Sequence, residues 1–221
     1  MLLSLMRKLL LLAGALAGIV FVPLYVKAAP LQPQAQSWSV DEARPAADWR
    51  AQATQADRAR IRNWRRTWME GLRAGRRNHA AEIAREGALL DPDAAQLHPG
   101  LPAGAYRCRT IKLGSADGGG PAYVAYPEFR CRVAGEGALL HLDKLTGSQR
   151  PHGHLYAEGP RRMIFLGSLQ LGDERQVLPY GSDPRRDMAG ILERIGERRW
   201  RLVFPRPAFE SVIDVVELVP A

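Results

Sequence analysis

The stretch MIFLGSLQL, residues 163–171, decides the fold class. In an extended chain its odd-numbered residues, from Met163 to Leu171, face one side, and its even-numbered residues, from Ile164 to Gln170, face the other. The stretch from Trp200 to Phe204 alternates in the same way, because Arg201 and Val203 separate its larger apolar residues. A period of two residues is typical of β-strands, so both stretches predict strands rather than helices.

Short β-rich runs separated by Gly, Pro and Asp fill the chain beyond residue 103. There are eight of them, at residues 104–113, 123–134, 138–145, 152–157, 162–171, 188–195, 199–205 and 212–219. The gaps leave no room for crossover helices, so we expect an antiparallel up-and-down meander. Closing it into an eight-stranded, lipocalin-like barrel would remove the exposed edges. The alternative is a two-sheet β-sandwich. In both cases the fold class is mainly β with an N-terminal helical segment.

The chain has two cysteines, Cys108 in the tetrapeptide YRCR and Cys131 in FRCR. If the two strands form a hairpin about residues 117–120, the cysteines face each other directly across the ladder. In an oxidising compartment this arrangement predicts a disulfide. The alternatives are free thiols and a redox pair, but the Cys-x-x-Cys spacing of redox motifs is absent.

The first 28 residues are typical of a secretory signal. Arg7 and Lys8 precede an apolar run at 9–26, and small residues flank Lys27 at the expected cleavage site. The alternative is an uncleaved inner-membrane anchor through residues 9–26, a run just long enough to span a bilayer. Both interpretations place residues 29–221 outside the cytoplasm, and we expect a periplasmic protein.

Composition divides the rest of the chain into four parts. Residues 29–53 are rich in Ala, Gln and Pro and indicate a flexible arm. Residues 54–90 are helical in pattern, residues 91–103 form a linker rich in Pro and Gly, and residues 104–221 contain the barrel domain.

The helical part begins with a capping box, in which Thr54 and Asp57 would each satisfy free backbone donors. Apolar residues then recur at helical spacing, which predicts one buried packing stripe. The stripe consists of Ile61, Trp64, Trp68 and Leu72. We expect a second short helix at 78–86, closed by Gly87.

The formal net charge is +8, and loss of residues 1–28 would remove three positive charges and leave +5. Of the 31 basic residues all but Lys8, Lys27, Lys112 and Lys144 are arginines, a skew that we attribute to coding bias. Export argues against a nucleic-acid partner. Membrane association is expected only through an uncleaved anchor or the basic surface.

The loop after the third predicted strand gathers hydroxyls and hydrogen-bond donors, and we consider it a candidate ligand-binding rim. Together with the two histidines that follow it, the rim consists of Lys144, Thr146, Ser148, Gln149, Arg150, His152 and His154. His152 and His154 share a strand face that His141 could approach, but no orienting partner indicates a metal site. Neither Ser148 nor Ser168 lies in Gly-x-Ser-x-Gly, so we predict no catalytic residue, metal or cofactor.

Several stretches resemble an uncharacterised bacterial family of exported proteins, domain of unknown function 4893. They are YRCR, YVAYPEFRCRV, KLTGSQRP, RRMIFLGSLQLGDE, RDMAGILERIG, RWRLVFP and FESVIDVVELVP. The resemblance extends from Trp49 onward and implies export and a shared fold, but no activity. More loosely, Gly104-Ala105-Tyr106 is similar to the Gly-x-Trp that opens lipocalin-like barrels.

These observations predict a non-enzymatic exported envelope module that binds a small apolar ligand or a protein partner. One alternative is a hydrolase that uses His152 or His154 with a hydroxyl from the rim loop. The other is a structural envelope protein that associates with anionic surfaces through its basic helix.

Overall fold

The structure is a computed structural model and describes residues 48–135 and 139–221. The predicted signal or anchor at 1–28 and the first part of the predicted arm lie outside these ranges. Within them, no helix combines the length and the apolar character that crossing a membrane requires.

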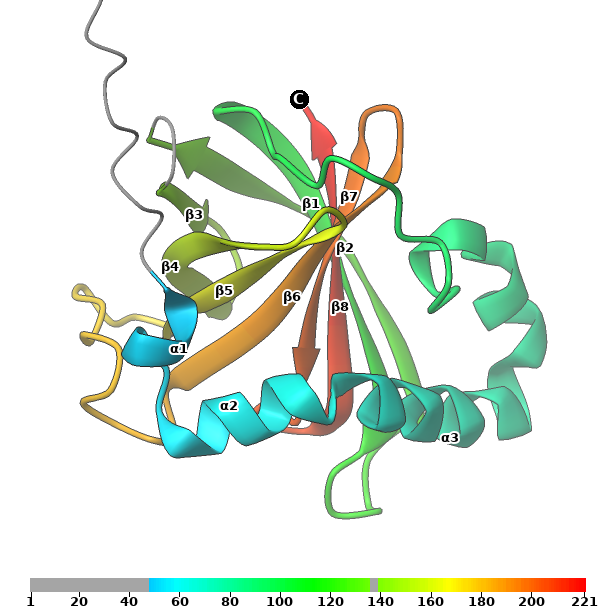
Figure 1. The fold of residues 1–221 in the computed structure, drawn as a ribbon. Coiled ribbons are helices and arrows are strands. Elements are labelled where there is room, and N and C mark those ends of the chain that lie inside the picture. Colours follow the sequence, from blue (N-terminus) through cyan, green and yellow to red (C-terminus); the bar gives the residue numbers. More distant parts are fainter. Residues whose placement is uncertain (1–47, 136–138) are drawn as a thin grey trace, which may run out of the picture. The chain divides into compact units, whose positions relative to one another are not determined.

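A helical segment precedes the strands (Figure 1). It consists of α1 (Trp49–Gln52), α2 (Gln55–Arg62), α3 (Trp64–Arg85) and the 3₁₀ turn η1 (Gly87–Leu89). The strands are β1 (Gly104–Ser115), β2 (Tyr123–Ala134), β3 (Leu140–Lys144), β4 (Gln149–Glu158), β5 (Arg162–Leu171), β6 (Asp187–Gly196), β7 (Arg199–Pro205) and β8 (Ser211–Pro220).

The strands form one closed antiparallel barrel. Each strand pairs with the next, and β1 pairs with β8, so the up-and-down barrel predicted from the sequence is confirmed and the sandwich is not found. Strand ends fall within two residues of the predicted ones, except that β4 begins at Gln149 instead of residue 152.

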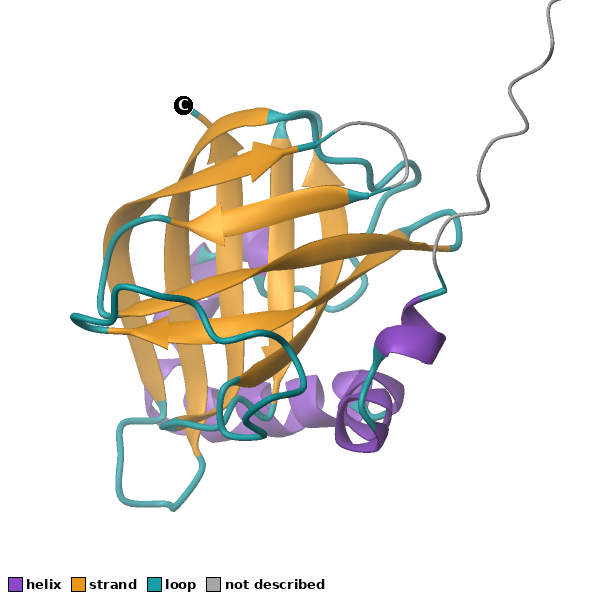
Figure 2. Cartoon of the chain, turned by 90° about the vertical axis from the view of Figure 1, so that its left-hand side faces the viewer, coloured by secondary structure: helices purple, strands orange, loops and turns teal. Residues whose placement is uncertain are grey.

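Alternation along the strands gives the barrel two apolar surfaces. One set of side chains fills the interior, with Phe165, Phe204 and Leu202 among the buried residues. The opposite faces carry a second apolar layer, which the helices cover (Figure 2). The strands are therefore buried on both faces along the covered side.

The helices pack on the outside of the barrel, α2 against β6 and α3 against β1, β7 and β8. The Thr54 hydroxyl accepts a hydrogen bond of 3.1 Å from the Asp57 N–H, so α2 begins where the capping box places it. Trp68 and Leu72 are buried against the outer face of the barrel. A kink at His79 divides α3 near the start of the second helix expected at 78–86.

Helix α1 lies in the range that we expected to be an arm. Its Trp49 is 4% exposed, and the indole N–H donates a hydrogen bond of 2.8 Å to Glu158 at the end of β4. Trp49 and Arg50 therefore contact the barrel. Farther along the chain, Leu101 in the predicted linker is also buried and belongs to the interior core.

The disulfide between Cys108 and Cys131 is confirmed, but the predicted register was wrong. Cys108 pairs with Phe129 and Cys131 with Tyr106, so the bridge joins diagonal neighbours instead of directly opposed residues. The pairs next to the turn centre the hairpin on Gly118, and a register shift between Arg109 and Ile111 moves the centre of the cysteine pairs to the point between Gly118 and Gly119. This point lies one position before the midpoint of the two cysteines. The Cα–Cα distance of 5.9 Å lies within the usual range for a disulfide.

Candidate functional site

One end of the barrel contains a cavity of about 90 Å³. It lies between the ends of β1, β4 and β8 and the loops that join β3 to β4 and β7 to β8. The cavity has an apolar side and a polar side. The walls of the apolar side include Phe129, Leu169, Met188, Phe204, Phe209 and Val216. The polar side includes Lys112, Lys144, Gln149, Glu210 and Asp214.

Lys112 on β1 connects the residues on the polar side of the cavity. Its Nζ lies 3.0 Å from Asp214 Oδ2 on β8, 3.0 Å from Gln149 Oε1 and 3.2 Å from Glu210 Oε2. Ser211 donates a hydrogen bond to the other carboxylate oxygen of Asp214. Burial alone would lower the pKa of Lys112, but the charges and hydrogen bonds of Asp214 and Glu210 together outweigh it, so the pKa is raised. Lys112 is therefore charged at neutral pH.

Lys144, at the end of β3, has a different environment. Its ammonium donates one hydrogen bond of 2.8 Å to the Gln149 carbonyl and lies 3.8 Å from the centroid of the Phe129 ring. Among the described residues it has no carboxylate within 4.0 Å. Burial, aided by the charges of Lys112 and Arg150, lowers the pKa of Lys144 to about 8. This amine is therefore partly neutral near physiological pH.

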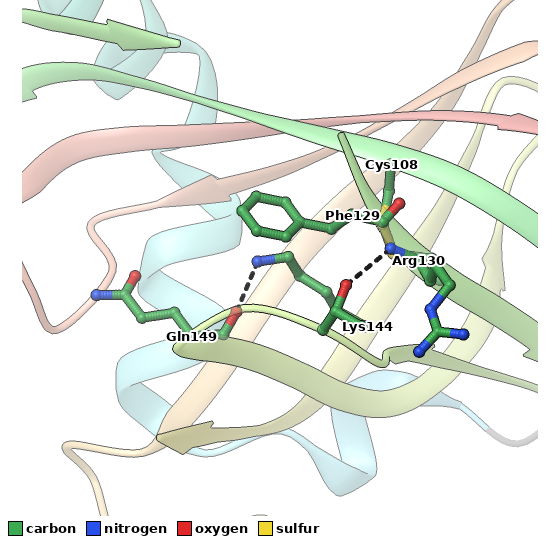
Figure 3. Close-up of a disulfide and its surroundings, with 7 residues drawn as sticks. Cys108, Phe129, Arg130, Lys144 and Gln149 are labelled. Atoms are coloured by element: carbon green, nitrogen blue, oxygen red, sulfur yellow. Dashed lines mark hydrogen bonds between the residues drawn. A yellow bond between two sulfur atoms is a disulfide. The ribbon is translucent and has the colours of Figure 1, made fainter. Parts of the chain in front are cut away.

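The disulfide lies beside Lys144. Cys131 pairs with Lys144 across β2 and β3, and Cys108 pairs with Phe129, whose ring contacts the ammonium. Figure 3 shows the Lys144 side chain extending toward the Phe129 ring and the Gln149 backbone. The covalent bridge thus fixes the two strands that position the lysine and its aromatic neighbour.

The structure separates the residues of the predicted rim. Lys144, Ser148 and Gln149 line the cavity. The Thr146 hydroxyl instead accepts a hydrogen bond of 3.0 Å from the Arg130 N–H and closes the loop. Arg150 points to the outer face. There it donates hydrogen bonds to the Gly147 carbonyl before β4 and to the Gly172 carbonyl after β5.

His152 and His154 also lie on the outer face, because they alternate with the inward residues of β4. Asp143 joins two imidazoles: its Oδ1 lies 2.7 Å from His141 Nε2 and 2.8 Å from His152 Nδ1. The rings of His141 and His154 are 4.8 Å apart in an edge-to-face arrangement. In the parts of the chain that the structure describes, no group of three His, Cys, Asp or Glu side chains is arranged to hold a metal ion.

The alternative hydrolase needed a histidine beside a hydroxyl of the rim loop. Ser148 lines the cavity, whereas His152 lies on the outer face, so the sheet separates them. The hydroxyl directly across the ladder from His152 belongs to Ser168, which is 1% exposed. A substrate could not contact this buried hydroxyl without a change of structure.

A family model described as a domain of unknown function, DUF4893, matches residues 49–218. The chain belongs to this family. The matched range begins at the buried Trp49 and ends in β8, so it includes the helical segment, the disulfide and every residue of the cavity. No curated protein and no solved structure matches the chain. The likeness of the DUF4893 barrel to lipocalin-like barrels therefore stays a prediction.

Sequence reasoning missed Lys112, Glu210 and Asp214, which are three of the five residues named above on the polar side of the cavity in this DUF4893 domain. A signal for two of them was present. Lys112 lies between Ile111 and Leu113, and Asp214 interrupts an otherwise apolar run, so each places a charge on the face opposite its apolar neighbours. That face is the inward one, because Ile111, Leu113 and Ile213 belong to the outer layer with Trp68 and Leu72 of α3. Their proximity depends on the pairing of β1 with β8, which closes the barrel.

Proposed function

We propose that this protein is an exported binding module that holds a small molecule in the open end of its barrel. The molecule would have an apolar body and one oxygen-bearing polar group. The observation that carries the proposal is the contrast within the cavity, where aromatic and aliphatic walls meet a lysine without a carboxylate partner among the described residues. Binding sites commonly combine apolar walls with a few polar groups that fix orientation.

The volume limits the size of the ligand. Cavities for drug-sized ligands measure about 300–1,000 Å³, and a cavity of about 150 Å³ holds one benzene molecule. The cavity of about 90 Å³ therefore suits a short aliphatic molecule or the end of a longer one. Packed side chains such as Phe165 and Phe204 fill the rest of the interior and leave no room for a whole lipid.

Charge favours an oxygen acceptor as the polar group. Lys112 is already neutralised by Asp214 and Glu210. Among the described residues, Lys144 contacts a carbonyl and a ring, and the attraction of Asp214 is smaller than the repulsion by Lys112. A carboxylate or carbonyl oxygen beside Lys144 would provide the missing partner. The predicted periplasmic location agrees with the disulfide, since disulfides persist in oxidising compartments.

Two-dimensional NMR of the labelled protein tests this proposal, with propionate and propanol as probes. We expect progressive shifts confined to residues of the cavity. Ser148→Trp, at the exposed rim, should block the cavity and abolish these shifts. Leu145→Trp is the matched control, because Leu145 lies in the same loop, is 44% exposed and does not line the cavity. Shifts that persist in Ser148→Trp would contradict the proposed site.

A further inference from the structure

Lysine is rare in this chain, and its placement is informative. In the ranges that the structure describes, the two lysines are Lys112 and Lys144, and both line the same cavity. The other long basic side chains of these ranges are arginines, whose guanidinium group keeps its proton in proteins. The described part of the chain thus places its primary side-chain amines in a single pocket.

The two amines are prepared for different roles. Lys112 is surrounded by oxygen atoms of Asp214, Glu210 and Gln149, which hold it as an ammonium. Lys144 is buried among apolar walls, and the positive charge of Lys112 disfavours a second one nearby. Nucleophilic lysines are activated in this way, by an apolar pocket or by an adjacent cation.

We propose that Lys144 captures a small aliphatic aldehyde by forming an imine at its Nζ. This inference rests on the proposed function, since it names the chemical class of the molecule that the cavity holds. An aldehyde fits both parts of the site, because its alkyl chain suits the apolar walls and its carbonyl carbon accepts an amine. The volume of about 90 Å³ favours a short chain.

The reaction balances without an oxidant or a reductant. The neutral amine of Lys144 bonds to the carbonyl carbon, and the electron pair of the C=O bond moves to the oxygen, which takes up a proton as the nitrogen loses one. The resulting carbinolamine expels the hydroxyl group, which leaves as water with the second nitrogen proton. One amine and one aldehyde thus give one imine and one water.

Neighbouring groups assist both steps. The pKa of about 8 leaves roughly a tenth of the Lys144 amines neutral at pH 7, hundreds of times more than an ordinary lysine with a pKa of 10.5. Lys112 bonds to the side chain of Gln149 and Lys144 to its backbone carbonyl, so the charge of Lys112 lies on the same side of the cavity and would favour the negative charge that develops on the aldehyde oxygen. A fixed cation in a buried site stabilises such a charge.

Reductive trapping tests the proposal on the full chain. The protein is incubated at pH 7 with propanal and sodium cyanoborohydride, which converts an imine into a stable propylamine, and the modified residue is located by peptide mass spectrometry. A lysine-containing reference peptide in the same mixture gives the ordinary rate. We expect Lys144 to be modified at least about tenfold faster than the reference lysine, since its neutral fraction is larger. The advantage of Lys144 over the reference lysine should shrink above pH 8, where the neutral fraction of the reference still rises and that of Lys144 does not.

Three variants complete the experiment. Lys144→Arg keeps the charge but removes the nucleophile, and it should abolish the fast modification. Ser148→Trp should slow modification of Lys144 by closing the cavity, whereas Leu145→Trp should leave it unchanged. Modification of Lys144 no faster than the reference, or equal rates in Ser148→Trp and Leu145→Trp, would overturn the inference.

The outcome is separable from that of the proposed function. If propionate and propanol shift the cavity resonances but Lys144 is not trapped by propanal, the pocket binds small molecules and imine formation is wrong. If neither the NMR shifts nor the trapping is observed, both proposals fail. Fast trapping of Lys144 that Ser148→Trp prevents supports both.

Discussion

Arg201 and Glu193 face each other across β7 and β6, and both side chains are fully excluded from solvent. The guanidinium lies 2.6 Å from the Glu193 carboxylate and 4.5 Å from the centroid of the Trp68 ring on α3. It also donates hydrogen bonds to the Ala88 and Leu89 carbonyls of η1. One charged side chain thus connects the outer face of the barrel to the helical segment.

Replacing Arg201 by Met should therefore destabilise the protein strongly. The change leaves Glu193 buried with Arg162 as its one charged partner among the described residues, and loss of one member of a buried pair costs about 3–5 kcal/mol. Urea unfolding followed by tryptophan fluorescence measures the effect. The double variant Glu193→Gln with Arg201→Met should lose less stability than the single variant, because a neutral amide then replaces the buried carboxylate.

An exposed ion pair provides the control for this prediction. Arg206 and Glu70 also join the barrel to α3, but their side chains are 48% and 44% exposed. Arg206→Met should therefore cost less than about 1 kcal/mol, as exposed pairs usually do. Equal losses of unfolding free energy in Arg201→Met and Arg206→Met would show that burial does not make the Arg201–Glu193 pair more important for stability.

Removal of the disulfide should weaken the barrel without changing its topology. Cys108 and Cys131 are 23 residues apart in sequence. Closing a loop of this length lowers the entropy of the unfolded chain and stabilises the folded protein by about 3 kcal/mol. For a domain of this size, that loss lowers the melting temperature by roughly 10 °C. Calorimetry of the double variant Cys108→Ser with Cys131→Ser tests this. An unchanged melting temperature would show that the bridge adds no stability.

Gly71 on α3 allows the helix to approach the barrel closely. A Cβ atom there would lie 2.6 Å from Ile213 Cγ2 and 3.2 Å from Leu113 Cβ. Alanine favours a helix by about 1 kcal/mol over glycine, but the overlap opposes it, and overpacking costs about 1–3 kcal/mol. Gly71→Ala should thus destabilise the protein in urea unfolding, whereas Gly100→Ala, with open space at its Cβ, should not.

The strands were predictable because two local signals agree in this chain. Alternation marks the strand β5 at 162–171, and Gly, Pro and Asp mark the turns between strands, so the number and the order of strands follow from short stretches alone. The register of the cysteines was not predictable in the same way. It depends on the centre of the hairpin at Gly118 and on a bulge after Arg109, and neither has a distinct sequence signature.

Half of the candidate site was hidden for a related reason. The predicted rim came from one loop, and its residues divide between two faces because β4 begins at Gln149, three residues before the predicted start. Lys112 and Asp214 are 102 residues apart and meet only when β1 and β8 close the barrel. Long-range pairing of this kind follows from the whole fold and not from local patterns.

The lowered pKa of Lys144 predicts how stability depends on pH. In the unfolded chain this amine has its ordinary pKa of 10.5, and in the folded protein burial lowers the pKa to about 8. Below pH 8 both states bind the proton, and the folded state bears the cost of a buried charge. Between pH 8 and pH 10.5 only the unfolded state keeps the proton, so the free energy of unfolding rises with pH.

Replacing Lys144 by Met should remove this rise. Discounted for screening by solvent at the open end of the cavity, the shift corresponds to about 1–2 kcal/mol, by which we expect the wild type to gain stability relative to Lys144→Met between pH 7 and pH 10. Urea unfolding of both proteins at several pH values measures the difference, which cancels the titration of other groups. Lys144→Arg, which stays charged throughout, should lack the rise as well. Parallel curves for wild type and both variants would mean that Lys144 titrates as an ordinary lysine, and the basis for a reactive amine in the cavity would be lost.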